Sequence, residues 1–177
     1  AGDDRISVRL ESASLFGSST LSSIDGGSGN DFITSNAMAW EGDEEGGQGY
    51  AQNIVRGGDG NDHIDATTFI REIQGNLDQG GPHVAKASIY GDAGNDVIVS
   101  RIDLPYGSPV GTIGHNYLDG GLGNDLLEVW SSVTSVTNEL YGGAGDDVLR
   151  VNGYGDSTLD GGAGNDRLYG DGGDTTF

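Results

Sequence analysis

A short glycine-rich phrase, repeated from one end of the chain to the other, constrains the fold more than any other feature of the sequence. The phrase reads Gly-Gly-x-Gly-Asx-Asp-x-(Ile/Leu/Val), and the chain opens within a truncated copy of it. The copies occupy residues 2–6, 26–33, 57–64, 91–98, 120–127, 142–149 and 161–168. A fixed phrase between spacers of variable length is typical of a solenoid, in which each copy forms the same turn of successive coils.

The spacers vary in length, as the intervals between successive sixth-position aspartates show: 27, 31, 34, 29, 22 and 19 residues. The shortest interval has room for two short strands and two turns, so we expect longer intervals to add loops opposite the phrase. Residues 66–87 and 99–116 contain the only prolines and are expected to be irregular, whereas the acidic run 41–47 is expected to be a solvated loop.

Apolar residues flank each phrase with the period-2 alternation of a β-strand. The residue two positions after the repeat Asp should stack in one internal ladder, formed by Ile33, Ile64, Ile98, Leu127, Leu149 and Leu168. The residue two positions before each phrase should form a second ladder, made of Ile24, Val55, Ile89, Leu118, Leu140 and Leu159. The pattern predicts an all-β parallel solenoid of about six coils, forming one domain over residues 1–177, with long irregular loops on one side.

The composition limits the classes of function. Apolar residues make up only 34% of the chain, so bound metal is expected to supplement a thin core. The formal net charge of -20 argues against nucleic-acid binding, and the absence of Cys excludes disulfides. No apolar run approaches the roughly 18 residues of a membrane span. The first residues show no signal peptide, so we expect that a signal was removed, lies elsewhere, or belongs to a longer protein.

The phrase itself has the chemistry of a cation site. Its glycines permit positive φ and a tight concave loop, which can turn carbonyl oxygens toward a common centre. The repeat Asp adds one carboxylate to each turn, and an all-oxygen site of this kind suits Ca²⁺. A single copy would be read as an Asx-Gly turn without metal. Seven copies in register favour a row of calcium sites.

These residues identify a family resemblance. The phrase resembles the nonapeptide of RTX proteins, the haemolysin-type calcium-binding repeats, and copies from Gly2 to Leu168 cover most of the chain. The resemblance implies a right-handed parallel β-roll with Ca²⁺ between neighbouring turns, in a bacterial protein exported by a type I system. Every phrase is followed by a spacer, which is similar to single-row RTX solenoids. Seven stacked loops leave up to about six intercoil ions, and these would bring the charge of -20 to about -8.

The resemblance also implies the ligands. The carboxylate ligands would be the repeat aspartates Asp4, Asp31, Asp62, Asp96, Asp125, Asp147 and Asp166. The carbonyl ligands would come from the second and fourth positions of the loops, which are Gly27, Gly29, Gly58, Gly60, Asp92, Gly94, Gly121, Gly123, Gly143, Gly145, Gly162 and Gly164. Asp92 is the one departure from glycine among these positions.

Several other features carry alternative interpretations. His63, His83 and His115 are expected to be solvated loop residues rather than zinc ligands or catalytic groups, with His63 pointing outward. The tryptophans and tyrosines at 40, 130, 50, 106 and 154 could stack on sugars, but core packing or loop anchoring is favoured. Residues 152–160 resemble a degenerate copy of the phrase on the opposite side of the coil, with Ser157 in place of Asp, and residues 170–174 resemble another.

The sequence therefore predicts a non-enzymatic, extracellular calcium-binding module, secreted or attached to the cell surface, with a structural or adhesive role. It would fold on binding Ca²⁺ after export, and its partners would include a surface or matrix polysaccharide. One alternative is a stabilising module of a larger secreted enzyme, such as a protease, lipase or polysaccharide epimerase. Another is a subunit that self-associates through its coil ends into a filament or surface layer.

Overall fold

The computed structural model describes residues 1–13, 17–40, 47–71, 81–104, 111–171 and 173–177. Within these residues all regular structure is β-strand, and no helix could cross a membrane. One sheet contains β1 (Arg5–Ser12), β3 (Phe32–Trp40), β5 (His63–Arg71), β7 (Val97–Asp103), β9 (Leu126–Ser131), β11 (Val148–Gly153) and β13 (Arg167–Gly170). The other contains β2 (Gly17–Ser28), β4 (Gln48–Asp59), β6 (Val84–Ala93), β8 (Ile113–Leu122), β10 (Val136–Ala144), β12 (Asp156–Ala163) and β14 (Thr175–Thr176).

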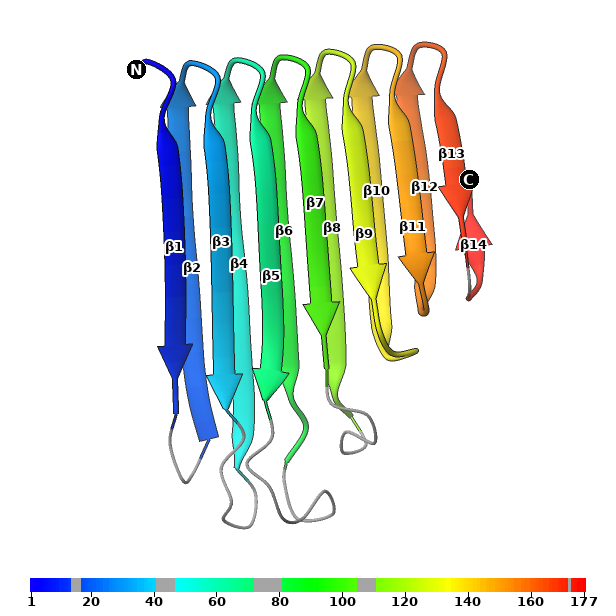
Figure 1. The fold of residues 1–177 in the computed structure, drawn as a ribbon. Helices are drawn as coiled ribbons and strands as arrows, with labels where there is room; N and C mark the ends of the chain where they lie inside the picture. The colour runs from blue at the N-terminus through cyan, green and yellow to red at the C-terminus, as the bar shows by residue number, and fades with distance from the viewer. Residues whose placement is uncertain (14–16, 41–46, 72–80, 105–110, 172) are drawn as a thin grey trace.

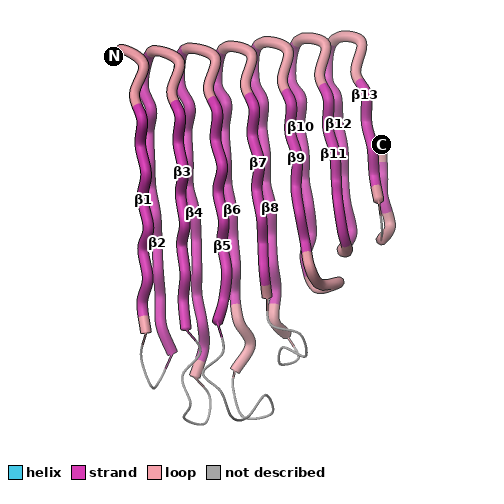
Figure 2. Tube along the Cα trace, in the orientation of Figure 1, coloured by secondary structure: helices cyan, strands magenta, loops and turns pink. Residues whose placement is uncertain are grey.

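Successive strands alternate between the two sheets, and every pairing within a sheet is parallel (Figure 1). The chain therefore rises by one strand in each sheet with every coil, which confirms the predicted parallel β-roll. Each sheet has seven strands, so the roll has one coil more than the six or so expected. The glycine-rich phrases form the turns along one edge of the roll, which is the upper edge in Figures 1 and 2.

The spacers are more regular than expected. Strands occupy 66–71, 84–87, 99–103 and 113–116, so the predicted irregular excursions over 66–87 and 99–116 are wrong for these residues. The physical reason is that period-2 burial continues through them, as the alternation along His63–Arg71 shows. Pro82 lies just before β6, whereas the other two prolines and residues 41–46 of the acidic run lie outside the described residues.

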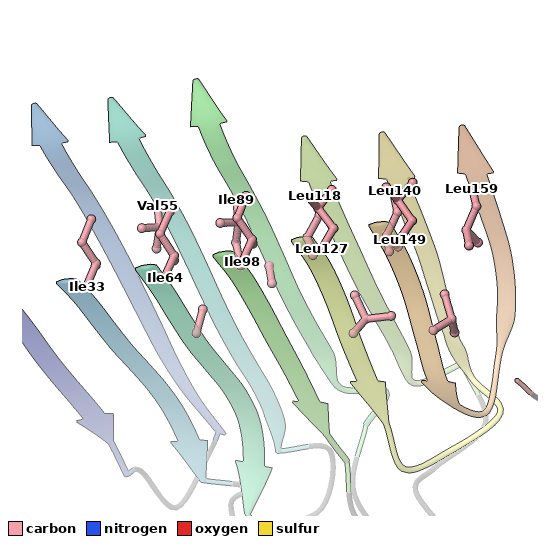
Figure 3. Packing of buried hydrophobic residues seen from close by; sticks show 14 residues of the cluster. Ile33, Val55, Ile64, Ile89, Ile98, Leu118, Leu127, Leu140, Leu149 and Leu159 are labelled. Atoms are coloured by element: carbon pink, nitrogen blue, oxygen red, sulfur yellow. The ribbon is translucent and has the colours of Figure 1, made fainter. Parts of the chain in front are cut away.

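The core consists of two facing ladders of aliphatic side chains, as predicted (Figure 3). Register pairs Ile33 with Ile64 and Ile64 with Ile98 in the first ladder, and Val55 with Ile89 in the second. Ile24 and Leu168, at the two ends of the ladders, are only partly buried. Because each coil contributes one side chain to each ladder, the hydrophobic interior is two residues thick.

Buried polar side chains continue the stacking below the aliphatic ladders. The Asn116 Nδ2 donates to Asn138 Oδ1 at 2.8 Å, and Asn138 Nδ2 donates to Ser157 Oγ at 3.2 Å. All three side chains are at least 96% buried, so each hydrogen bond offsets the cost of removing a polar group from water. The turn between β11 and β12 lies on the edge opposite the phrases, where the degenerate copy around Ser157 was predicted (Figure 1).

Candidate metal centre

The loops along the phrase edge share one backbone conformation. The second and fourth positions of every complete copy have positive φ, for example 97° at Gly121 and 126° at Gly123. Asp92 holds the same conformation with φ of 72°, and it is the single non-glycine residue with positive φ among those described. The Arg56 guanidinium contacts its carboxylate at 3.0 Å, which helps to hold this strained position. The prediction that the phrase folds into a repeated concave loop is confirmed.

The first position of the phrase requires glycine because a side chain would not fit there, and not because the backbone has a positive φ. A Cβ built on Gly120 would lie 2.4 Å from Asp125 Oδ2 and 2.6 Å from the carbonyl oxygen of Gly142 in the next coil. The same two kinds of oxygen surround the first glycine of four other loops, Gly26, Gly57, Gly91 and Gly142. Each of these five loops therefore directs a carboxylate oxygen and a carbonyl oxygen from the adjacent coil toward one point.

The repeat aspartates form a ladder along the roll. The backbone N–H of each one donates to Oδ1 of the repeat Asp in the following coil, as from Asp96 to Asp125 at 2.8 Å. Six such bonds of 2.7–2.9 Å connect Asp4, Asp31, Asp62, Asp96, Asp125, Asp147 and Asp166. Asp4 is exposed and Asp166 half-buried, whereas the five between them are at least 98% buried.

The second carboxylate oxygen of these five residues has no partner. Oδ2 of Asp31, Asp62, Asp96, Asp125 and Asp147 is buried and makes no hydrogen bond. Buried polar atoms in native proteins are almost always paired, and an unpaired carboxylate oxygen is especially costly. A cation beside each Oδ2 would remove this cost. The unpaired oxygens lie next to the carbonyls described above, which is the arrangement that a row of intercoil cations requires.

A second ladder runs beside the first in the opposite direction. The fifth-position Asx side chain accepts the backbone N–H of the fifth residue in the following coil, as from Asn124 to Asn95 at 2.7 Å. Six of these bonds connect Asp3, Asn30, Asn61, Asn95, Asn124, Asp146 and Asn165. Each gap between neighbouring loops is therefore crossed by one side-chain bond in each direction, which fixes the spacing of the donor oxygens.

Electrostatics favour neutralisation of the aspartate row. Neighbouring strands lie about 4.8 Å apart, so the stacked carboxylates are close enough to repel one another. Burial raises the pKa of Asp96 to about 7 and that of Asp125 to about 6, with a further upward contribution from neighbouring repeat aspartates. Burial also raises the pKa of Asp62 and Asp147. A bound cation would favour the ionised form of these aspartates at neutral pH.

The donor set fits Ca²⁺. Carboxylate and carbonyl oxygens are the hard ligands that Ca²⁺ prefers. No group of three His, Asp or Glu side chains gathers among the described residues, so backbone carbonyls would have to supply much of the coordination. Carbonyl oxygens of the second and fourth positions also face the next coil, since a Cβ on Gly60 would lie 2.0 Å from Gly29 O. Sequence reasoning missed the carbonyls of the first glycines, although the presence of glycine there in all six complete copies was a signal.

Comparison with known families agrees with this geometry. The model of the RTX calcium-binding nonapeptide repeat matches residues 14–37, 48–67, 88–101, 110–129, 137–153 and 153–177, which is more than half of the chain. The chain belongs to the RTX repeat family. It therefore carries a calcium-binding repeat module. Comparisons with curated proteins and with solved structures found no match.

The histidines of this RTX chain lie outside the aspartate row. His63 is on the outer face of β5, as predicted, and stacks on Phe32 with ring centroids 4.8 Å apart. His115 lies in β8, 3.2 Å from Glu139. The prediction that His63 and His115 are loop residues is therefore wrong, because the strands extend through both positions. The prediction that His83 is solvated is wrong, because its side chain is fully buried and Nδ1 accepts the backbone N–H of Gly49 at 3.1 Å. His83 is buried because it lies between the neighbouring coils, which contact it through Gly49 on one side and Thr112 on the other.

The aromatic residues are more exposed than expected. Trp130 is 48% exposed and Tyr154 57% exposed, so core packing is wrong for both of them. The indole N–H of Trp40 donates to Glu11 at 2.9 Å, and the Tyr50 hydroxyl donates to Gln52 at 2.6 Å. The tyrosine at position 106 lies outside the described residues. The thin interior accommodates one aliphatic side chain per strand at each level, and rings are left on the outside.

Proposed function

We propose that this chain is a calcium-dependent structural and adhesive module of a secreted or surface-attached protein, and that it has no catalytic role. The observation that carries the proposal is the row of five buried carboxylate oxygens without partners. Binding of Ca²⁺ would supply the missing interaction, and its free energy would then contribute to folding. Extracellular placement is supported by the family, whose members are typically exported by type I secretion.

We further propose five ions in the gaps where a carboxylate and a carbonyl oxygen converge, and a sixth beside the exposed Asp4. Five ions would reduce the formal charge of -20 to about -10, and six to about -8. The metal-free chain would then be expanded by its own repulsion, which suits export in an unfolded state. Folding would occur where Ca²⁺ is plentiful.

A calcium titration followed by circular dichroism tests the proposal. We expect β-structure to be lost in chelator and regained cooperatively with Ca²⁺, and native mass spectrometry to count five or six ions. Mg²⁺ should be a poor substitute, because it demands regular octahedral geometry and gives up its water reluctantly. Full β-structure in chelator, with no change on adding Ca²⁺, would contradict the proposal.

The Asp125→Asn variant sharpens this test. The amide preserves Oδ1 as the acceptor for the Asp96 N–H and removes one buried charge from the row. We expect the variant to be less stable than the parent in Ca²⁺, by about 2–3 kcal/mol if one ion at roughly 100 times its Kd is lost. In chelator, where the parent is expected to lose its β-structure, the variant should retain at least as much residual β-structure as the parent, because repulsion is reduced. Thermal melts in Ca²⁺ and circular dichroism in chelator measure this reversal, and a variant with less stability in Ca²⁺ and less β-structure in chelator would indicate a purely structural role for Asp125.

A further inference from the structure

The two sheets expose outer faces of different chemistry. Face 1 is defined here as the outward side chains of β1, β3, β5, β7, β9, β11 and β13, and face 2 as those of β2, β4, β6, β8, β10 and β12. Charges are distributed unequally between them, although the chain as a whole is strongly acidic. The acidic residues of the loops belong to neither face.

Face 1 collects the arginines. Six of the seven arginines of the chain point outward from this sheet, Arg5, Arg9, Arg71, Arg101, Arg150 and Arg167, against four carboxylates, Glu11, Asp65, Asp103 and Glu128. Arg5 lies over the Phe32 ring at 4.6 Å and Arg150 over the Tyr169 ring at 5.5 Å. Neither has a carboxylate partner among the described residues. Trp130 and Tyr169 add exposed aromatic surface to the same face.

Face 2 has the complementary character. Seven carboxylates point outward from it, Asp25, Asp59, Asp92, Asp119, Glu139, Asp156 and Asp160, against the two basic residues Arg56 and Lys86. Three tyrosines lie among these carboxylates. The ring centroids of Tyr90 and Tyr117 are 5.6 Å apart, and those of Tyr117 and Tyr141 are 5.5 Å apart. The strip of tyrosines is therefore continuous across β6, β8 and β10.

The structure already contains one contact of the kind that would join the two faces. The Arg56 guanidinium lies 4.3 Å from the centroid of the Tyr90 ring and 3.0 Å from Asp92. A guanidinium between a ring and a carboxylate gains both cation–π and ionic attraction. Among the described residues no guanidinium lies over Tyr117 or Tyr141, and both rings lie beside acids, Asp119 for Tyr117 and Glu139 for both. Arginines of face 1 have the matching chemistry.

We propose that face 1 of one copy of this chain packs on face 2 of a second copy, so that calcium-loaded rolls associate side by side. Charge complementarity selects this pairing, because face 2 against face 2 would bring carboxylates together. Six or seven strands about 4.8 Å apart, each with three outward residues about 6.8 Å apart, give a face of roughly 600 Å². Two such faces bury about 1,200 Å², the lower end of the range for specific interfaces.

The contact is heterologous, because each copy offers a different face to each neighbour. Such contacts generate rings or open arrays and do not stop at a dimer. Association through the faces is distinct from stacking of coil ends, since it leaves the edge strands unpaired. It rests on the proposed function only in requiring the folded, calcium-loaded roll.

Sedimentation velocity over a range of protein concentrations, with saturating Ca²⁺, tests the proposal. We expect species that grow beyond dimers at low ionic strength and dissociate in about 1 M salt, where the Debye length falls to about 3 Å. Circular dichroism and calcium binding on the same samples show whether the roll is folded. A folded, calcium-loaded chain that stays monomeric at low salt and high concentration would overturn this proposal while leaving the proposed function intact.

Charge-reversed pairs identify the faces. The first pair is Arg150→Glu with Arg167→Glu on face 1, and the second is Asp119→Lys with Asp160→Lys on face 2. Each double variant alone should be monomeric, and an equimolar mixture of the two should associate again. Asp171→Lys with Asp174→Lys changes the net charge as much as the second pair, outside both faces, and should not dissociate the assembly. Association that survives both reversals would assign the contact to another surface and overturn the proposal.

Discussion

At the scale of single residues, each position of the phrase has its own physical reason. The second and fourth glycines provide positive φ, as at Gly121 and Gly123, whereas Gly120 leaves room for two oxygens. The two oxygens of the Asp125 carboxylate differ in their contacts. Oδ1 accepts a hydrogen bond from a backbone N–H of the neighbouring coil, whereas Oδ2 has no hydrogen-bond partner. Each phrase thus supplies one part of a candidate cation site, its carboxylate oxygen, and the next coil supplies the carbonyl oxygen.

The Gly120→Ala substitution should remove one ion and leave the fold intact in Ca²⁺. The new methyl group would lie 2.4 Å from Asp125 Oδ2 and 2.6 Å from Gly142 O, so it would occupy the point on which both oxygens converge. We expect one ion fewer by native mass spectrometry and a stability loss of about 2–3 kcal/mol at high Ca²⁺. Leu122→Ala in the same loop, where the side chain is 62% exposed, is the matched control. An unchanged ion count would place the cation elsewhere.

Protonation of the aspartate row should compete with Ca²⁺. In the metal-free roll the pKa of Asp96 is about 7 and that of Asp125 about 6, both above the ordinary value of 3.8. A folded-state pKa above the unfolded value means that the folded chain binds more protons. The metal-free roll should therefore be most stable below about pH 4, where both carboxyl groups are protonated. The stability that these two groups contribute should be lost as the pH rises through about 6 to 7.

Calcium affinity should change in the opposite direction, falling as the pH is lowered through the same window, because each ion must displace protons. Calorimetric titrations at several pH values, in buffers of different ionisation enthalpy, measure both the affinity and the number of protons released. An affinity that does not depend on pH between about 5 and 8 would contradict the raised pKa values of Asp96 and Asp125.

At the scale of the strand, the alternation of inward and outward residues sets the stability of each coil. Leu127 is fully buried in the aliphatic ladder, whereas its neighbour Leu126 points outward and is half-buried. The interior is only two residues thick, so a deletion at one level has few neighbours that could fill the space.

Leu127→Ala should therefore destabilise the calcium-loaded roll by about 2–5 kcal/mol, the usual range for a buried leucine. Leu126→Ala removes the same atoms from a partly exposed site and should cost clearly less. Urea unfolding in saturating Ca²⁺ compares the two variants directly. Equal losses would mean that the ladder is not the main source of packing energy at this level.

At the scale of the whole molecule, most of the architecture could be predicted, because one repeated phrase fixes the turns and the flanking alternation fixes the strands. Register follows from the phrase, so the ladders of Ile33 and Val55 were predicted correctly. Spacer lengths do not show where a strand ends. Because prolines follow later in the same spacers, residues 66–71 and 99–103 were predicted to be irregular, whereas they are strands. The burial of His83 and the role of the first glycines depend on contacts between coils, which no single repeat reveals.

The sharing of oxygens between adjacent loops has a consequence for how the ions leave. Each converging pair joins a carboxylate of one coil to a carbonyl of the next, so the proposed ions would form a line of sites in which neighbours share a loop. Such a line behaves as a one-dimensional lattice with nearest-neighbour coupling. Release should begin at the ends, where Asp4 and Asp166 are least buried, and progress inward like fraying. A vacancy at the centre would divide the row into two shorter segments, each of which holds its remaining ions less firmly than the intact row.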